Sequence, residues 1–131
     1  MNDKKTVLII EDEPSIRKAI MDKLETSEFL SIEAKNGEEG LIAAFEKKPD
    51  LILLDILMPK MDGMVMMKKL REEGDWGKKV PIIILTNLSA DDRITSGVVI
   101  NEPAYYLMKT DWSLDEVVAK IRSTLEETEN K

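Results

Sequence analysis

The sequence predicts an α/β fold in which five parallel strands alternate with helices. Short apolar runs and amphipathic stretches follow one another along nearly the whole chain. Three of the runs are almost continuous Ile, Leu and Val, which is typical of parallel strands buried on both faces. The 131 residues contain no repeat, linker or low-complexity stretch. We therefore expect one domain over residues 1–131 with a core at about 6–126, and helices on both faces of its sheet joined by right-handed crossovers.

Five apolar runs are the predicted strands. They are Val7–Ile10, Leu30–Ala34, Leu51–Leu54, Ile82–Leu85 and Tyr105–Met108.

Start signals lie between these runs and predict the helices. Pro14 suits the first position of a helix, and Ile16, Ile20 and Leu24 follow it at a four-residue spacing. Asn36 can cap a second helix, with Glu39 as its capping-box partner. The third predicted helix is Gly63–Gly74.

The last predicted helix has the clearest start. Ser113 and Glu116 form a capping box, and Trp112 and Val117 stand where a hydrophobic staple would. One apolar face follows, made of Leu114, Val117, Val118, Ile121 and Leu125.

Three segments predict little regular structure. Residues 90–100 are rich in poor helix formers, so we expect a short or frayed fourth helix there. The stretch "GDWGKK", Gly74–Lys79, is predicted to be a solvated loop. Residues 126–131 are predicted to be a frayed polar tail.

Composition excludes several kinds of chemistry and partner. The chain has no cysteine and no histidine, which rules out thiolate and imidazole sites. Its net charge of −7 argues against direct binding of nucleic acid. The apolar runs are too short for a signal peptide or a membrane span. We therefore expect a soluble, cytoplasmic protein.

Charged and hydroxyl side chains stand where the predicted strands end. Glu11, Asp12 and Glu13 follow the first strand and Asp55 the third, while Thr86 follows the fourth and Lys109 the fifth. Ligands of open parallel sheets collect at the carboxyl ends of the strands. Any one of these acids alone is best read as a solvated loop residue, but their combined placement predicts a shared site.

Such a group of carboxylates favours a cation. Two unit charges about 4 Å apart repel by about 4 kcal/mol at an effective dielectric constant near 20. Lys109 offsets part of this repulsion, and an oxygen-ligated divalent ion such as Mg²⁺ offsets more. The residues thus predict a Mg²⁺ site that prepares one carboxylate for phosphoryl chemistry.

At these residues the chain resembles the receiver domain of bacterial two-component response regulators. The resemblance is carried, in order, by "VLIIEDEPSIR", "PDLILLDILMPKMDG", "VPIIILTNLSA" and "YYLMK", and it runs from about Val7 to Leu125. It implies a CheY-like, flavodoxin-like (βα)5 fold with strand order 2-1-3-4-5, and a single receiver domain.

The resemblance also implies a role for each site residue. Asp55 would accept a phosphoryl group from a histidine kinase or a histidine phosphotransfer protein. Glu11, Asp12, Asp55 and the main-chain carbonyl of Leu57 would bind Mg²⁺. Lys109 would pair with a phosphoryl oxygen. Thr86 and Tyr106 would be the switch residues, with Thr86 turning toward the phosphoryl group and Tyr106 following inward.

The implied function is a phosphoacceptor switch rather than a conventional enzyme. Because the chain has no histidine, the phosphoryl donor must be another molecule, either a phosphohistidine protein or a small acyl phosphate. Phosphorylation would change the face formed by the fourth helix, the fifth strand and the last helix. That face would control a downstream protein or a missing output domain, in a monomer or a phosphorylation-linked dimer.

Two other functions remain open. A binding module that needs no phosphorylation could keep the same fold. A Mg²⁺-dependent phosphatase could use Asp55 as nucleophile, although such enzymes usually carry a second aspartate two residues later, where this chain has Leu57.

One local feature departs from the family's pattern, and another allows a second interpretation as a metal site. The family's usual Lys-Pro is here Lys109-Thr110, which predicts a trans peptide bond. Methionines gather after the acceptor, at positions 58, 61, 64, 66 and 67; a Cu(I) site is conceivable, but helical spacing favours core packing.

Overall fold

Five parallel strands form one sheet in the order β2-β1-β3-β4-β5. The computed structural model describes residues 4–56, 61–87 and 105–129. The strands are β1 (Lys5–Ile10), β2 (Phe29–Ala34), β3 (Leu51–Leu54), β4 (Ile82–Thr86) and β5 (Tyr105–Met108). The predicted fold class and strand order are therefore confirmed.

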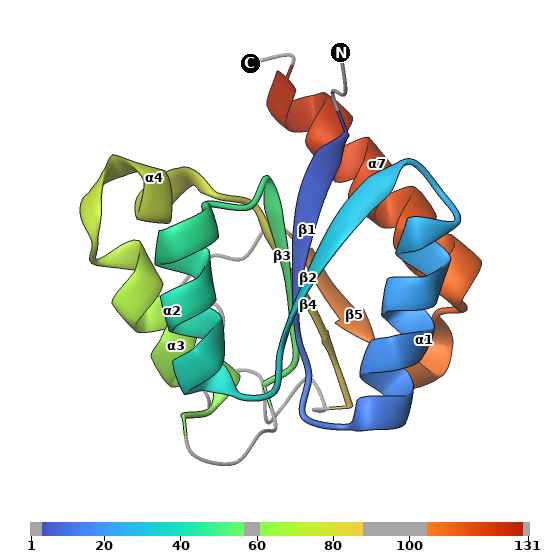
Figure 1. Cartoon of the computed structure of the whole chain (residues 1–131), viewed down its shortest axis with the longest axis horizontal. Coiled ribbons are helices and arrows are strands. Elements are labelled where there is room, and N and C mark those ends of the chain that lie inside the picture. Colours follow the sequence, from blue (N-terminus) through green and yellow to red (C-terminus); the bar gives the residue numbers. More distant parts are fainter. Residues whose placement is uncertain (1–3, 57–60, 88–104, 130–131) are drawn as a thin grey trace.

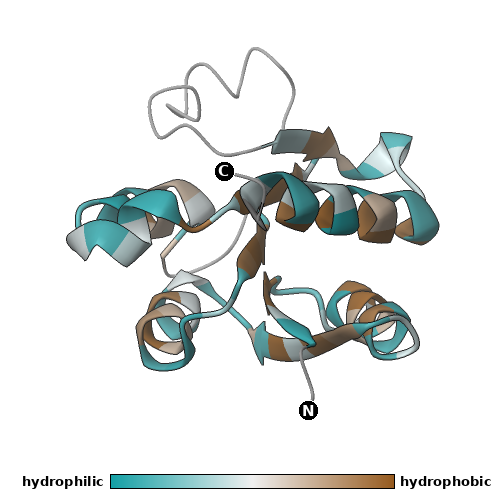
Figure 2. Cartoon of the chain, turned by 90° about the horizontal axis from the view of Figure 1, so that it is seen from above, coloured by the Kyte–Doolittle hydropathy of each residue, from teal (hydrophilic) through white to brown (hydrophobic). Residues whose placement is uncertain are grey.

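Helices cover both faces of the sheet (Figure 1). On one side lie α1 (Pro14–Glu25) and α7 (Leu114–Glu129). On the other lie α2 (Gly37–Lys47), α3 (Gly63–Arg71) and the short α4 (Gly74–Lys79). The brown, hydrophobic residues of these helices lie mainly toward the sheet, and teal residues lie outward (Figure 2).

Alternation along the strands divides the core in two. Leu8, Ile52 and Ile84 belong to the cluster under α2 and α3, whereas their neighbours Ile9, Leu53 and Ile83 belong to the cluster under α1 and α7. Successive strand residues point to opposite faces, so a strand covered on both faces needs apolar side chains throughout. This requirement explains the continuous Ile and Leu runs.

Capping side chains start the helices as predicted. Asn36 Oδ1 accepts from the Glu39 amide at 2.9 Å, although the Glu39 carboxylate accepts from the amide of Lys35 rather than of Asn36. Ser113 and Glu116 form the reciprocal capping box, at 3.0 and 3.2 Å. Met64, Met66 and Met67 are buried in the core, which agrees with the packing interpretation of the methionines.

Two local predictions were wrong. Gly74–Lys79 is the helix α4, not a solvated loop, because Trp76 packs edge-on against Phe45 and Arg71 donates to the carbonyls of Gly77, Lys78 and Val80. The α7 helix continues to Glu129, past the predicted start of the polar tail, and buries Leu125 in the core.

The structure also bears on the peptide bond after Lys109, the predicted fourth helix and membrane spans. No cis peptide bond occurs in the described residues, in keeping with a trans Lys109-Thr110 bond, and residues Lys109–Asp111 form a 3-10 turn. The predicted fourth helix at residues 90–100 lies outside the described residues. Within the described ranges, no helix has the length and hydropathy needed to cross a membrane.

Candidate functional site

The carboxyl ends of four strands bring the predicted site residues to one edge of the sheet. Ile10 at the end of β1 is opposite Leu54 at the end of β3, so Glu11 and Asp55 follow at the same level. The Asp55 amide donates to the Ile10 carbonyl at 3.0 Å, and this bond extends the pairing by one residue. Thr86 ends β4, and Lys109 follows β5 directly.

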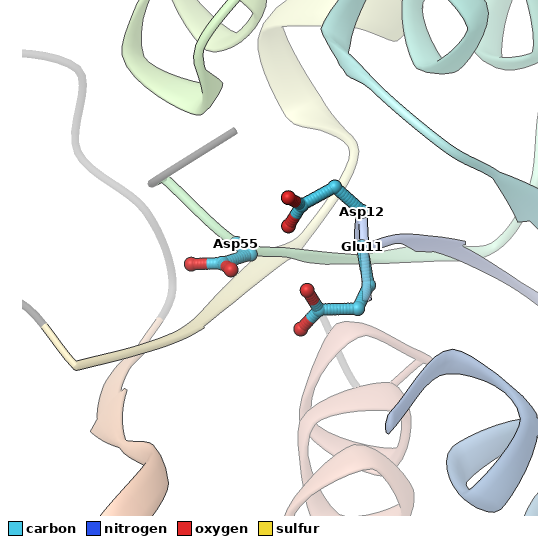
Figure 3. Close-up of side chains that lie close together, drawn as sticks. All are labelled: Glu11, Asp12 and Asp55. Carbon is cyan, nitrogen blue, oxygen red and sulfur yellow. The ribbon is translucent and has the colours of Figure 1, made fainter. Parts of the chain in front are cut away.

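Three carboxylates converge at this edge. Glu11, Asp12 and Asp55 each offer an oxygen atom, and these oxygens all lie within 4.8 Å of one another. Figure 3 shows the side chains of Glu11 and Asp12 extending from the end of β1 into the same space as Asp55. Glu11 and Asp55 are 3% and 5% exposed, while Asp12 is half-buried, so the cluster is open to solvent mainly on the side of Asp12.

Lys109 bridges two of these carboxylates. Its Nζ lies 2.6 Å from Glu11 Oε1 and 3.0 Å from Asp55 Oδ2. One ammonium and three carboxylates leave a formal charge of about −2 when all are ionised, which suits a divalent cation.

Burial and charge shift the pKa values of the buried pair. Burial raises the pKa of Glu11 from 4.5 to about 7; the Lys109 hydrogen bond opposes this rise and the nearby Asp55 charge adds to it. Burial lowers the pKa of Lys109, but its hydrogen bonds and charge interactions with Glu11 and Asp55 outweigh burial, so its net pKa lies above 10.5. Lys109 therefore stays cationic at neutral pH.

Thr86 and Tyr106, the predicted switch residues, lie on adjacent strands. Thr86 is fully buried, and its hydroxyl finds no hydrogen-bond partner among the described residues. A buried hydroxyl without a partner is energetically costly. Tyr106 is half-buried and packs against the core cluster under α2 and α3.

The residues present fit Mg²⁺. The three candidate side-chain ligands offer only carboxylate oxygen, the donor that hard divalent cations prefer, and the chain has no thiolate or imidazole that would favour a softer metal. The fourth predicted ligand, the carbonyl of Leu57, lies outside the described residues.

Sequence reasoning missed the role of Gly63. A Cβ at this position would lie 2.5 Å from the carbonyl oxygen of Asp55, so only glycine lets α3 start this close to the acceptor. Asp62 caps the same helix by accepting from the Val65 amide at 2.9 Å. The Asp-Gly pair at the end of "DILMPKMDG" was the signal, because it combines a capping residue with a residue that tolerates close approach.

Sequence reasoning also missed Arg17, which is buried in α1 beside the site. Its spacing of three and seven residues to Ile20 and Leu24 places a charge on the apolar face of the helix. A charged residue on such a face was the available signal, because burial of a guanidinium requires hydrogen-bond partners.

Comparisons with known proteins agree with this geometry. The sequence model of the response regulator receiver domain matches residues 7–122. A probable transcriptional regulator, ycf27, of Porphyra purpurea is 41% identical over 125 residues, which are 95% of this chain and 49% of that protein. The phosphate regulon transcriptional regulatory protein PhoB of Pseudomonas aeruginosa is 32% identical over 124 residues, 95% of this chain and 53% of that protein. The chain thus spans about half the length of these relatives.

Solved structures show the same fold. A CheY-like response regulator receiver domain protein of Methanospirillum hungatei superimposes with a TM-score of 0.87 at 23% identity, covering 98% of both chains. The receiver domain of the Francisella response regulator 1452 superimposes with a TM-score of 0.83 at 28% identity, covering 95% of this chain and 99% of that one.

Proposed function

We propose, from the premise that this chain belongs to the response regulator receiver family, that Asp55 is the phosphoacceptor of a Mg²⁺-dependent signalling switch. The phosphoryl donor would be a histidine kinase or a histidine phosphotransfer protein. One observation carries the proposal: Asp55 lies within a cluster of three carboxylates and is held by Lys109 at 3.0 Å.

The transfer step can be written with its atoms balanced. A carboxylate oxygen of Asp55 attacks phosphorus, the bond from phosphorus to the donor's imidazole nitrogen breaks, and that nitrogen leaves with the electron pair. The product is an acyl phosphate on Asp55. In this arrangement Lys109 stabilises negative charge on the transferred group, because its ammonium already lies against the acceptor.

Glu11, Asp12 and Asp55, with the carbonyl of Leu57, are the proposed Mg²⁺ ligands. Bound Mg²⁺ would supply the positive charge that relieves carboxylate repulsion and neutralises the phosphoryl oxygens. Glu11 must be ionised to serve as a ligand. The main-chain amide of Glu13, two residues further along the chain, favours the ionised form by donating to Glu11 Oε2 at 3.2 Å.

Thr86 is proposed to respond to phosphorylation by a hydrogen bond from its hydroxyl to the phosphoryl group. A phosphoryl group on Asp55 brings strong acceptor oxygens to the edge where the Thr86 hydroxyl is buried and unpaired within the described structure. A hydrogen bond from this hydroxyl would favour one conformation of the end of β4, and Tyr106 on the neighbouring strand would repack with it. The output, on a downstream protein or an attached domain, would respond to this shift.

The test is intact-mass measurement after incubation with acetyl phosphate and Mg²⁺. We expect one added phosphoryl group on the wild-type chain and none on Asp55→Asn. Asp62→Asn is the matched control, because this half-buried residue caps α3 and asparagine caps equally well. Labelling of Asp55→Asn would show that another residue is the acceptor. A wild-type chain that stays unlabelled would favour a phosphorylation-independent binding module, and release of phosphate from many equivalents of a phosphorylated metabolite would favour the phosphatase.

A further inference from the structure

We propose that Arg17 is a positioning residue that holds the peptide group between Glu11 and Asp12 in the orientation that Mg²⁺ binding requires. This inference rests on the proposed function, because it concerns the same carboxylates. Arg17 touches neither the acceptor nor any of the three carboxylates in the described contacts; it acts through the main chain.

Two hydrogen bonds define the position of the Arg17 guanidinium. Its Nη1 donates to the main-chain carbonyl of Glu11 at 2.8 Å, and this bond is buried. Its Nε donates to Glu33 Oε1, also at 2.8 Å. The planar guanidinium therefore joins α1, the end of β1 and the edge strand β2 through two directional bonds, which the single ammonium of a lysine cannot reproduce.

The Glu11 carbonyl belongs to the peptide group that links two of the three candidate ligands. The Glu11 amide is already fixed, because it donates to the Ala34 carbonyl at 3.1 Å. Strand pairing ends at this residue, so Arg17 supplies the described bond on its carbonyl side. Without Arg17 this peptide group can rotate, and rotation moves the Glu11 and Asp12 side chains relative to each other.

The guanidinium is buried although a groove opens beside it. A groove of about 350 Å³ lies between α1 and β2, and Arg17, Met21 and Glu33 are among the residues that line it. Glu33 itself is half exposed. A guanidinium beside an open groove could extend into solvent, so its inward placement indicates that the Glu11 carbonyl is its specific partner.

A positioning role and a purely electrostatic role predict effects of opposite sign. Arg17 carries a positive charge near a cation site, so loss of that charge alone would tighten Mg²⁺ binding. Loss of positioning would weaken it, by about tenfold, which is the lower end of the range for groups that orient metal ligands. The sign of the change therefore decides between the two roles.

The experiment measures Mg²⁺ affinity by titration calorimetry of the folded full chain, for wild type, Arg17→Met and Arg17→Lys. We expect both variants to bind Mg²⁺ about tenfold more weakly, since lysine keeps the charge but not the two-armed geometry. The matched control is Arg122→Met, which removes an exposed Arg–Glu pair with Glu28, between α7 and the chain before β2; its affinity should stay within about twofold.

A second readout separates positioning from a general loss of structure. The Mg²⁺ concentration for half-maximal labelling by acetyl phosphate should rise by the same factor, while labelling at saturating Mg²⁺ returns to the wild-type level. A protein that is only partly folded would lose maximal labelling instead. Should Arg17→Met fail to fold, Arg17→Lys, which keeps the charge and the aliphatic stem, decides the question by itself.

The outcomes for the two proposals are distinct. If wild type binds no Mg²⁺, the proposed function fails. If wild type binds Mg²⁺ and Arg17→Met binds it as tightly or more tightly, or Arg17→Lys restores wild-type affinity, the positioning role is overturned and the proposed function stands.

Discussion

At the scale of single residues, the site combines burial with charge. Glu11 is nearly inaccessible, yet it must be ionised to serve as a ligand, and Lys109 is the described side chain that offsets this conflict with a direct ion pair. Burial raises the pKa of Glu11 more than the ion pair with Lys109 lowers it, so the pair offsets only part of the cost of burying this charge. Ionisation of Glu11 should therefore lower the stability of the metal-free protein.

The first prediction concerns pH. The pKa of Glu11 is about 7 in the folded protein and near 4.5 in the unfolded chain, so between these values the folded state binds the extra proton. The metal-free free energy of unfolding should consequently fall as pH rises from about 5 to 7, by up to about 3 kcal/mol, and then level off. Urea melts in the absence of Mg²⁺ measure this directly.

Glu11→Gln is the control for this prediction, since it removes the titrating group and keeps the side-chain shape. Its stability should change less over the same interval. The lowered pKa values of Glu28 and Glu116 affect stability only as pH falls toward and below 4.5, so they do not obscure the window. Equal slopes for wild type and variant would contradict the assignment.

The second prediction concerns Gly63. Alanine at this position places a Cβ against the main chain of Asp55 and Ile56, at 2.5 and 2.8 Å, and main-chain atoms cannot move aside cheaply. We expect a loss of about 1–3 kcal/mol in the free energy of unfolding. Gly40→Ala is the comparison, because its Cβ would meet only side-chain atoms of Ile10, the nearest being Cδ1 at 2.5 Å, and side-chain atoms shift at less cost than main-chain atoms. A loss at position 40 as large as that at position 63 would contradict the argument.

At the scale of elements, α4 shows how tertiary contacts can create a helix that local preference does not favour. Its six residues include two glycines, which are poor helix formers. Arg71 Nη1 binds three carbonyls at or just after its end, and the ring centroids of Trp76 and Phe45 lie 6.1 Å apart at 63°. The contacts with α2 and α3 therefore stabilise α4 in place of intrinsic propensity.

The third prediction tests this explanation. Trp76→Ala should lower the free energy of unfolding by about 2 kcal/mol, because it removes a half-buried aromatic ring from the core cluster under α2 and α3. Trp76→Phe keeps an aromatic partner for Phe45 and should lose about half as much. Urea denaturation of both variants provides the measurement. If both variants have the wild-type free energy of unfolding, the Trp76 ring does not stabilise α4 and the explanation is wrong.

At the scale of the whole molecule, four strands and their order assemble the site. Placing β1 between β2 and β3 sets Glu11 beside Asp55, and the order β3-β4-β5 brings Thr86 and Lys109 to the same edge. The fold is thus strained electrostatically at one edge, where three carboxylates meet one ammonium. A ligand that binds there should stabilise the entire domain.

The fourth prediction concerns metal-dependent stability. Mg²⁺ at ten times its dissociation constant should raise the free energy of unfolding by about 1.4 kcal/mol. Asp55→Ala removes one of the repelling carboxylates, so this variant should be more stable than wild type without metal and should gain less from Mg²⁺. Urea melts with and without millimolar Mg²⁺ give both comparisons. If Mg²⁺ does not change the free energy of unfolding of the wild type, both expectations are contradicted.

The sequence predicted what local pattern and strand topology control. Continuous runs such as Leu51–Leu54 indicated buried strands, and the residues just after them, Asp55 among them, were expected at one edge because parallel strands share a direction. Arg17 and α4 escaped prediction for a common reason. Each depends on a long side chain reaching another element, and neither the reach of Arg17 to the Glu11 carbonyl nor that of Arg71 to Val80 leaves a periodic signal.

The ion pair between Lys109 and Asp55 joins residues 54 positions apart, and Glu11 is more distant still along the chain. Loop closure over such separations is slow compared with local helix formation. A nascent chain that has not yet added β5 lacks the ammonium and keeps the repulsion among its acids. Pairing of Lys109 with Glu11 and Asp55 should therefore be among the last events of folding, and stopped-flow refolding should show it as a late phase.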